Sequence, residues 1–535
     1  MIKITIPVFA RAIGRGARML LVFALAGLLL APQTSHMAVT APSDLDTTFG
    51  MGGKVRTDFT GGIDRAGVIA LQADGKIVVG GLTVLSNIPE SPQTFGLARY
   101  NLDGSLDLTF GSGGKVGTGF GPPGFGGSSI GDMAIQPDNK IVAAGFNGSV
   151  ADLHGDAVVA RYTLNGSLDA TFGSGGRVTI HFAGSISAAN AIALQPDGRM
   201  IIGGYDITPN ATPDTVRALA RINANGALDP TFGSGGKVLS SKGRIRRLAL
   251  QPDGKIVAVG ESAPMVQRFN PNGSLDATFG SGGEVDTPGF GLSANDVALQ
   301  VDGKIVCAGS AHNGSDIALI RYNPNGSLDT SFGSGGVAIN DLGNDDAAYG
   351  VAIQSNGKIV IAGTSNQKFT VLRYNSNGTL DPTFNPGPPD FGCMDPPSPR
   401  LFDYAADPAI QVDGKIVAAG SACLNTDFVL ARYIGDPAFD YCVQDESNGN
   451  LLKLNSITGD YQFMGCRSGL TLGGKGTLIK RGSLLFLQVV ANDRRIMASI
   501  DRGTNRGTAS VQVFSPASNF TIMDRNISNN SCACP

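Results

Sequence analysis

Seven aspartates and seven arginines recur at matching places along most of the chain, and they are the first candidates for chemistry. The aspartates stand in segments of the SLD type, and each arginine precedes an aromatic or aliphatic residue. Carboxylates in such numbers could bind calcium, and guanidinium groups could bind an acidic sugar. The aspartates are Asp46, Asp107, Asp169, Asp229, Asp276, Asp329 and Asp381, and the arginines are Arg99, Arg161, Arg221, Arg268, Arg321, Arg373 and Arg432.

The repetition of these residues favours a structural role over a ligand site. A group that occurs in every repeat is most simply a part needed to build every repeat. Aspartate side chains accept hydrogen bonds from backbone N–H groups of their own turn, and arginines pair with carboxylates between strands. We therefore predict that truncating one of these aspartates lowers thermal stability without altering ligand binding.

Other patterns for catalysis or metal binding are weak. The chain has only four histidines and contains no HExxH, GxSxG or GxxxxGK[ST] segment. His154 lies near Asp152 and Asp156, but a solvated loop is the favoured interpretation of that cluster. We expect no catalytic residue, no cofactor and no metal site, and a non-enzymatic role is favoured. The net charge of −3 at pH 7 offers no basic surface for a nucleic acid.

The elements that position the recurring residues are short strands. Apolar runs such as VIALQ (68–72), KIVVGG (76–81) and FGLARYN (95–101) are separated by D-G or N-G turns, and LDLTFGSGGKV (106–116) follows them. Such runs predict strands joined by tight hairpins, four to a unit, which we call a, b, c and d. The apolar runs are almost unbroken, so both faces of each sheet must be covered by neighbouring sheets.

The order of the markers predicts a closed ring. The array begins at 43–50 (SDLDTTFG) with only the last strand of a unit, and it ends after a third strand, FVLARY (428–433). An N-terminal strand that completes the last unit closes a β-propeller, whereas an open solenoid would show capping units. We predict an all-β chain with a seven-bladed propeller of four-stranded blades over residues 42–435. An open solenoid is the alternative.

The repeat segments resemble a known family. Segments of the form SLDxTFGxGGKV, AIALQPDGKIVVAG and LARYNxNGSLD are similar to the bacterial delta-60 repeat, a β-propeller repeat domain of unknown function. The resemblance covers residues from about 44 to 433. It implies a propeller fold and almost nothing about activity.

The N-terminal end predicts export. A basic region of 18 residues precedes the apolar run Met19 to Ala31, which is followed by polar residues. This arrangement is typical of a signal peptide, and the run is shorter than the roughly 20 residues of a membrane-spanning helix. We interpret residues 1–41 as a signal peptide with a short linker, and we expect the mature protein to be secreted, periplasmic or on the cell surface, without a membrane span.

Six of the seven cysteines follow residue 390, and an oxidising compartment favours disulfides among them. Pairing of Cys442 with Cys466 and of Cys393 with Cys423 is favoured because each pair is close in sequence. Cys307 stands in a strand pattern and should be a buried free thiol. Residues 436–535 lack the repeat and predict a small β-sandwich-like domain.

The variable b-to-c and d-to-a connections should gather at one end of the ring, and the uniform turns at the other. Function usually lies on loops held by a rigid scaffold, so we expect a site at the variable end and the channel mouth. The favoured function is an exported, non-enzymatic binding or structural protein, monomeric, with a carbohydrate or a cell-surface protein as partner. The alternatives are an extracellular enzyme that acts on a polysaccharide or another polymer through loop carboxylates, and calcium-stabilised adhesion.

Overall fold

The computed structural model describes residues 41–436 except 42, 60, 85–92, 121–126, 150–153, 209–213, 262, 264, 288–290, 313, 344, 392–402 and 423–426, and further strands between Tyr441 and Met523. All described elements are strands, and the part of the chain described here contains no helix. No described segment has the length and apolar character of a membrane-spanning helix. The predicted signal peptide (1–41) lies almost wholly outside the described residues.

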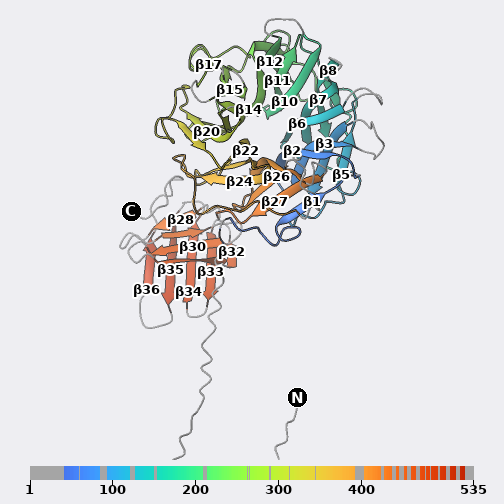
Figure 1. Ribbon diagram of the computed structural model, residues 1–535. Coiled ribbons are helices and arrows are strands. Elements are labelled where there is room, and N and C mark those ends of the chain that lie inside the picture. Colours follow the sequence, from blue (N-terminus) through green and yellow to red (C-terminus); the bar gives the residue numbers. More distant parts are fainter. Residues whose placement is uncertain are drawn as a thin grey trace, which may run out of the picture. The chain divides into compact units, whose positions relative to one another are not determined.

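The repeats form antiparallel meanders that surround a centre (Figure 1). One four-stranded sheet contains β2 (Asp64–Leu71), β3 (Ile77–Val84), β4 (Gln93–Tyr100) and β5 (Lys115–Thr118). Another contains β14 (Arg244–Leu250), β15 (Ile256–Glu261), β16 (Val266–Phe269) and β17 (Glu284–Val285), and a third contains β18 (Ser293–Leu299), β19 (Ile305–Ala311), β20 (Asp316–Tyr322) and β21 (Val337–Asn340).

The remaining sheets of the repeats differ in size. One eight-stranded sheet contains β6 (Gly127–Ile135), β7 (Ile141–Ser149), β8 (His154–Tyr162), β9 (Arg177–Ile180), β10 (Ile186–Leu194), β11 (Met200–Ile207), β12 (Thr215–Ile222) and β13 (Lys237–Lys242). A three-stranded sheet contains β22 (Asp346–Ile353), β23 (Ile359–Ser365) and β24 (Lys368–Tyr374). The last sheet contains β25 (Tyr404–Ile410), β26 (Ile416–Ala422), β27 (Asp427–Tyr433) and β1 (Lys54–Thr57).

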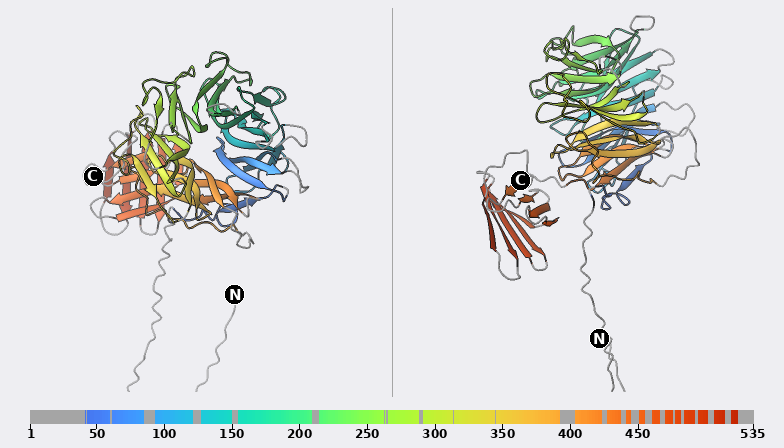
Figure 2. Two further views of the ribbon diagram at one scale, coloured as in Figure 1. Left: turned by 45° about the horizontal axis from the view of Figure 1, so that its top comes forward. Right: turned by 60° about the vertical axis from the view of Figure 1, so that its left-hand side comes forward.

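The pairing of β1 with β27 joins the two ends of the repeat array. The two strands are antiparallel, with Lys54 opposite Ala431 and Thr57 opposite Phe428. Arg56 also forms an ion pair with Asp427, with 2.7 Å between Nε and Oδ2. The blue and orange strands therefore lie side by side in Figure 2. This is the pairing that the order of the sequence markers predicts.

The prediction of seven four-stranded blades is wrong. Among the described strands, five sheets have four strands, of which one lies beyond the repeats, while the other sheets have eight, three and five strands. The meanders β6–β9 and β10–β13 merge because Ile186 of β10 pairs in parallel with Gly155 of β8. Among the described residues, the sheet β22–β24 has three strands, and the backbone of residues 385–391 after the turn at Phe384 is irregular where the sequence is rich in proline and glycine (NPGPPDFG).

The local sequence explains the tight turns and the core. Gly75 lies in the turn between β2 and β3 with φ +83°, a conformation that glycine adopts without the steric cost of a side chain. Apolar side chains pack between neighbouring sheets, as Val68 and Phe95 do against Ile130 and Val158. Both faces of these sheets are thus covered, in agreement with the unbroken apolar runs.

Two further antiparallel sheets follow the repeats. One contains β28 (Tyr441–Gln444), β29 (Leu451–Leu454), β30 (Asp460–Gly465) and β31 (Leu470–Lys475). The other contains β32 (Thr477–Arg481), β33 (Leu484–Ala491), β34 (Arg494–Asp501), β35 (Arg506–Val513) and β36 (Asn519–Met523). Residues 436–535 are thus rich in strands, and the boundaries of the predicted domains stay predictions.

Candidate functional site

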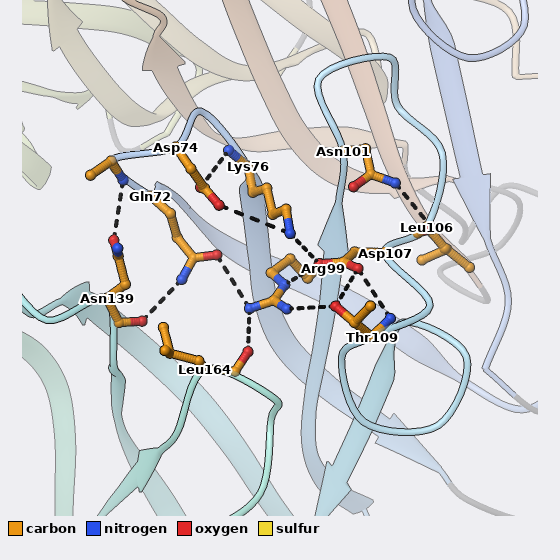
Figure 3. A network of polar contacts seen from close by, with 11 residues as sticks. Gln72, Asp74, Lys76, Arg99, Asn101, Leu106, Asp107, Thr109, Asn139 and Leu164 are labelled. Carbon is orange, nitrogen blue, oxygen red and sulfur yellow. Dashed lines mark hydrogen bonds and ion pairs between the residues drawn. The ribbon is translucent and has the colours of Figure 1, made fainter.

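The recurring charges form a network at the uniform turns, shown for one unit in Figure 3. Arg99 of β4 donates from Nε to Oδ2 of Asp107 at 2.8 Å. Lys76, in the turn before β3, donates to the same oxygen at 2.9 Å. The other oxygen of Asp107 accepts hydrogen bonds from the backbone N–H of Thr109 at 3.1 Å and from its hydroxyl group at 2.7 Å. One carboxylate therefore joins a strand and two turns.

The structure brings every predicted aspartate together with a predicted arginine. Each aspartate also accepts the backbone N–H of the threonine or serine two residues later. The pairs besides Arg99 with Asp107 are Arg161 with Asp169, Arg221 with Asp229, Arg268 with Asp276, Arg321 with Asp329, Arg373 with Asp381 and Arg432 with Asp46, all at 2.7 or 2.8 Å.

The same arginines also link successive units. Nη1 of Arg99 donates to the backbone oxygen of Leu164 in the next unit at 2.6 Å. Arg432 donates in the same way to the backbone oxygen of Leu102, which connects the last unit to the first. Arg373 differs because it pairs with the carboxylate of Asp436 at 3.1 Å. The arginine side chains are therefore used within the ring.

Electrostatics keep the network aspartates ionised. Burial alone would raise the pKa of Asp107, but hydrogen bonds from Lys76 and Thr109 and the charge of Arg99 outweigh burial and hold this pKa well below its usual range. The same balance lowers the pKa of Asp46 to about 2. These carboxylates are ionised at neutral pH, and each already accepts hydrogen bonds from several protein donors. Such an arrangement suits a structural ion pair.

A second polar cluster lies on the inner wall of the ring. The first strands of the units contact one another around the centre, where Figure 1 shows β2, β6, β10, β14 and β22. Four of these first strands carry a charged residue directly after a register shift in their pairing with the next strand. The residues are Asp132 in β6, Arg247 in β14, Asp296 in β18 and Asp407 in β25.

Arg247 connects several of these inner strands. Its Nη1 donates to the backbone oxygens of Gly131 at 2.8 Å and Asn190 at 3.2 Å. The guanidinium group also lies 3.8 Å from Oδ1 of Asp132 and 3.6 Å from Oδ1 of Asp296. The side chain of Arg247 is 14% exposed, so its charge is largely enclosed by the inner wall. This arginine therefore ties β14 to β6, β10 and β18.

Burial raises the pKa values of the three carboxyl groups in this inner cluster. The pKa of Asp296 rises to about 6 and that of Asp407 to about 8, although the charge of Arg247 lowers both. The pKa of Asp132 is also raised by burial. Three carboxyl groups share one guanidinium group, so the cluster retains protons at pH values where an exposed aspartate would have none.

Further polar and aromatic side chains lie on the first strands of the units and beside them. Tyr349 of β22 and Tyr404 of β25 make an edge-to-face contact with 5.8 Å between ring centroids. Elsewhere on the wall, Arg246 lies 2.7 Å from the carboxylate of Glu261, and Arg244 lies 3.5 Å from it. The guanidinium carbon of Arg244 also lies 4.5 Å from the ring centroid of Tyr205. Arg244 begins β14 and is opposite Glu261, the last residue of β15, so this charged group lies beside the variable connections.

The remaining predicted candidates are dispersed. Asp156 pairs with His181 at 2.8 Å, and Asp152 lies outside the described residues. Among the described residues, no group of three His, Cys, Asp or Glu side chains could hold a metal ion. Cys307 is a buried free thiol, as predicted.

The four cysteines with predicted pairings lie outside the part described with side chains. Cys393, Cys423 and Cys466 fall in undescribed segments, and only the backbone of Cys442 is described, in β28. Both pairings stay predictions.

Sequence analysis missed Asp132, Arg247, Asp296 and Asp407. A signal for them was present, because each is a charge directly before an apolar or proline-containing strand segment, as in DMAI (132–135) and RLAL (247–250). The corresponding residues of other units are uncharged, for example Val68 and Ala191. These four charges do not recur from unit to unit, so the repeat pattern does not include them.

Comparisons with known proteins support the fold. Residues 72–110, 136–172, 195–232, 251–279, 300–332 and 354–384 match the family described as "Domain of unknown function (DUF5122) beta-propeller". No curated protein sequence matches the chain.

Several solved structures are similar to the chain. A protein of unknown function from Bacteroides caccae is 13% identical, with a TM-score of 0.33, and the match covers 56% of this chain and 92% of that one. The β-propeller domain of the Trilobed protease from Pyrococcus furiosus is 12% identical, with a TM-score of 0.37, over 71% of this chain and 96% of that one. Similarities this weak indicate neither a ligand nor an activity. The matched segments of this chain are thus similar to a β-propeller repeat family of unknown function.

Proposed function

We propose that this protein is an exported, non-enzymatic binding propeller of the delta-60 repeat type, with its site at the channel mouth and the variable connections. The observation that carries the proposal is the use of the recurring charges. Every recurring aspartate is bonded to an arginine and to its own turn, so these charges build the ring. The residues that differ between units are those left for recognition.

The proposed location and partner rest on the sequence. The basic and apolar segments within residues 1–41 support export and cleavage. A protein on the outside of the cell meets polysaccharides and surface proteins, and the polar and aromatic groups of the channel mouth suit either class. We propose a monomer that binds a carbohydrate or a cell-surface protein.

Two measurements test this proposal. Expression of the full chain in a bacterial host, followed by fractionation and N-terminal sequencing, should locate a product that begins between about residues 36 and 42 outside the cytoplasm. A glycan and surface-protein binding screen on that product should identify a ligand whose binding survives Asp107→Asn. A full-length cytoplasmic product would contradict export, and loss of binding in Asp107→Asn with unchanged melting would contradict the assignment of the site.

A polymer-active enzyme is the second candidate, and the inner carboxyl groups favour it. Their pKa values of about 6 for Asp296 and about 8 for Asp407 lie where general acids and bases work. These residues lie on strands and not on the loops where we expected catalytic acids. Release of reducing ends from polysaccharides by the native chain, and its loss in Asp407→Asn, would support this candidate.

A further inference from the structure

The first strands of the units carry different kinds of side chain at one shared position, the register shift. Each first strand has one unpaired residue at the register shift in its pairing with the second strand. In β6, β14, β18 and β25 this residue directly precedes Asp132, Arg247, Asp296 and Asp407. In the neighbouring strands β10, β14, β18 and β22 this residue is Asn190, Arg246, Asn295 and Tyr349. In β25, β2 and β6 it is Ala406, Gly67 and Gly131. We call the first four residues the polar arc.

The register shift turns the polar arc away from the core. The residues that directly precede the arc are buried, with 0% exposure for Ile245, Ala294 and Ala348. By contrast, the side chain of Arg246 is 42% exposed and Tyr349 is 37% exposed. Bulges commonly re-aim one side chain in this way beside functional sites. The side chains of Arg246 and Tyr349 are therefore exposed, and Asn190 and Asn295 are partly exposed.

Neighbouring groups fix the arc in place. The side-chain amide of Asn190 donates to the backbone oxygen of Ile245, and that of Asn295 donates to the backbone oxygen of Ala348, both at 2.8 Å. The carboxylate of Glu261 holds Arg246, and Tyr404 packs against Tyr349. A site whose side chains are already held loses little conformational entropy when a ligand binds.

Positive charge gathers at the Arg246 end of the arc. Arg246 and Arg244 face the single carboxylate of Glu261, and the exposed Lys242 precedes them in the chain. Arg217 is fully buried beside this group and donates to the backbone oxygen of Glu261 at 3.2 Å. Its pKa falls to about 10 because it is buried, although the charges of Glu284 and Glu261 raise it, and it stays cationic at neutral pH. Two carboxylates, those of Glu261 and Glu284, stand against the four cations Lys242, Arg244, Arg246 and Arg217, so positive charge is in excess here.

We propose that the polar arc binds one acidic sugar residue of a polysaccharide whose acidic groups are carboxylates. This inference rests on the proposed binding function and names its ligand class. Arg246 and Arg244 pair with the sugar carboxylate, since guanidinium groups match the geometry of a carboxylate. Asn190 and Asn295 hydrogen-bond to sugar hydroxyl groups, and the exposed ring of Tyr349 packs against the apolar face of the sugar.

Binding to three soluble polymers tests the ligand class. The probes are polygalacturonate, dextran sulfate and neutral dextran, measured by affinity electrophoresis and calorimetry with the full chain. We expect binding to polygalacturonate, weaker binding to dextran sulfate and none to dextran. Absence of binding to polygalacturonate would overturn the inference, while binding to dextran alone would overturn it and still agree with the proposed binding function.

Variants separate the arc from general charge effects. Arg246→Gln should raise the dissociation constant for polygalacturonate about tenfold or more, because a charge-assisted pair is lost. Tyr349→Ala should raise it about two- to tenfold, as expected for lost aromatic packing. The control Arg199→Gln removes the same charge from the turn network, and its affinity should not change. Equal losses in Arg246→Gln and Arg199→Gln, with both variants folded by circular dichroism, would show attraction by net charge alone and would refute the arc.

Discussion

Asp107→Asn is the sharpest test of the turn network. The substitution keeps the shape of the side chain and removes the charge that Arg99 and Lys76 share at 2.8 and 2.9 Å. The side chains of Asp107 and Arg99 are each 5% exposed, so the arginine is left buried without its partner. Breaking a deeply buried pair costs about 3–5 kcal/mol, and the position of this pair next to the solvated turns reduces the expected cost to about 2 kcal/mol.

Denaturant unfolding measures this cost. The chain has no tryptophan, so far-ultraviolet circular dichroism is the suitable probe. We expect a lower unfolding midpoint for Asp107→Asn and unchanged ligand affinity. The control is Asp103→Asn, because the side chain of Asp103 lies in an exposed turn and accepts hydrogen bonds from the N–H and hydroxyl groups of Ser105, which an asparagine oxygen can also accept, and its midpoint should not move. An unchanged midpoint for Asp107→Asn together with lost binding would refute the structural role.

Three further predictions concern the inner wall and the closure. Asp296 and Asp407 have raised pKa values in the folded protein, so their protonated forms contribute to the free energy of unfolding fully below about pH 4. This contribution should be lost as the pH rises through about 6 and 8, and a pH series of unfolding midpoints measures the loss. Arg247→Met removes the only cation of the cluster, so it should destabilise the protein more at pH 8 than at pH 5; equal effects at both pH values would contradict the pairing. Val55 and Leu430 are opposite each other in β1 and β27, so the pair Val55→Cys and Leu430→Cys should cross-link on oxidation and change mobility in a non-reducing gel, and failure to cross-link would contradict the closure.

The sequence was informative wherever a feature recurs. The recurrence of SLD, DGK and RY segments predicted four strands to a unit and the pairing of the chain's early strand with its late one, which β1 and β27 show. It also placed Asp107 in its own turn, where the carboxylate accepts the N–H of Thr109. Features set by backbone geometry repeat with the sequence, because the same turn needs the same residues each time.

Features that depend on single units escaped prediction. The recurring segments do not reveal that Ile186 pairs with Gly155 and merges two meanders, or that the described residues 385–391 after Phe384 are irregular. The cluster around Arg247 depends on three-dimensional closure, since its partners Asp132 and Asp296 lie in different units. The spacing of residues within one unit does not predict contacts between different units.

A paired comparison of Arg321→Gln and Arg246→Gln tests most directly whether the turn network stabilises the fold while the polar arc binds the ligand. Both substitutions remove one guanidinium group, from the turn network in one case and from the polar arc in the other. Melting temperature and affinity for polygalacturonate are measured on the same preparations. The account predicts that Arg321→Gln melts lower and binds normally, and that Arg246→Gln melts normally and binds weakly. The opposite assignment of the two effects would contradict it.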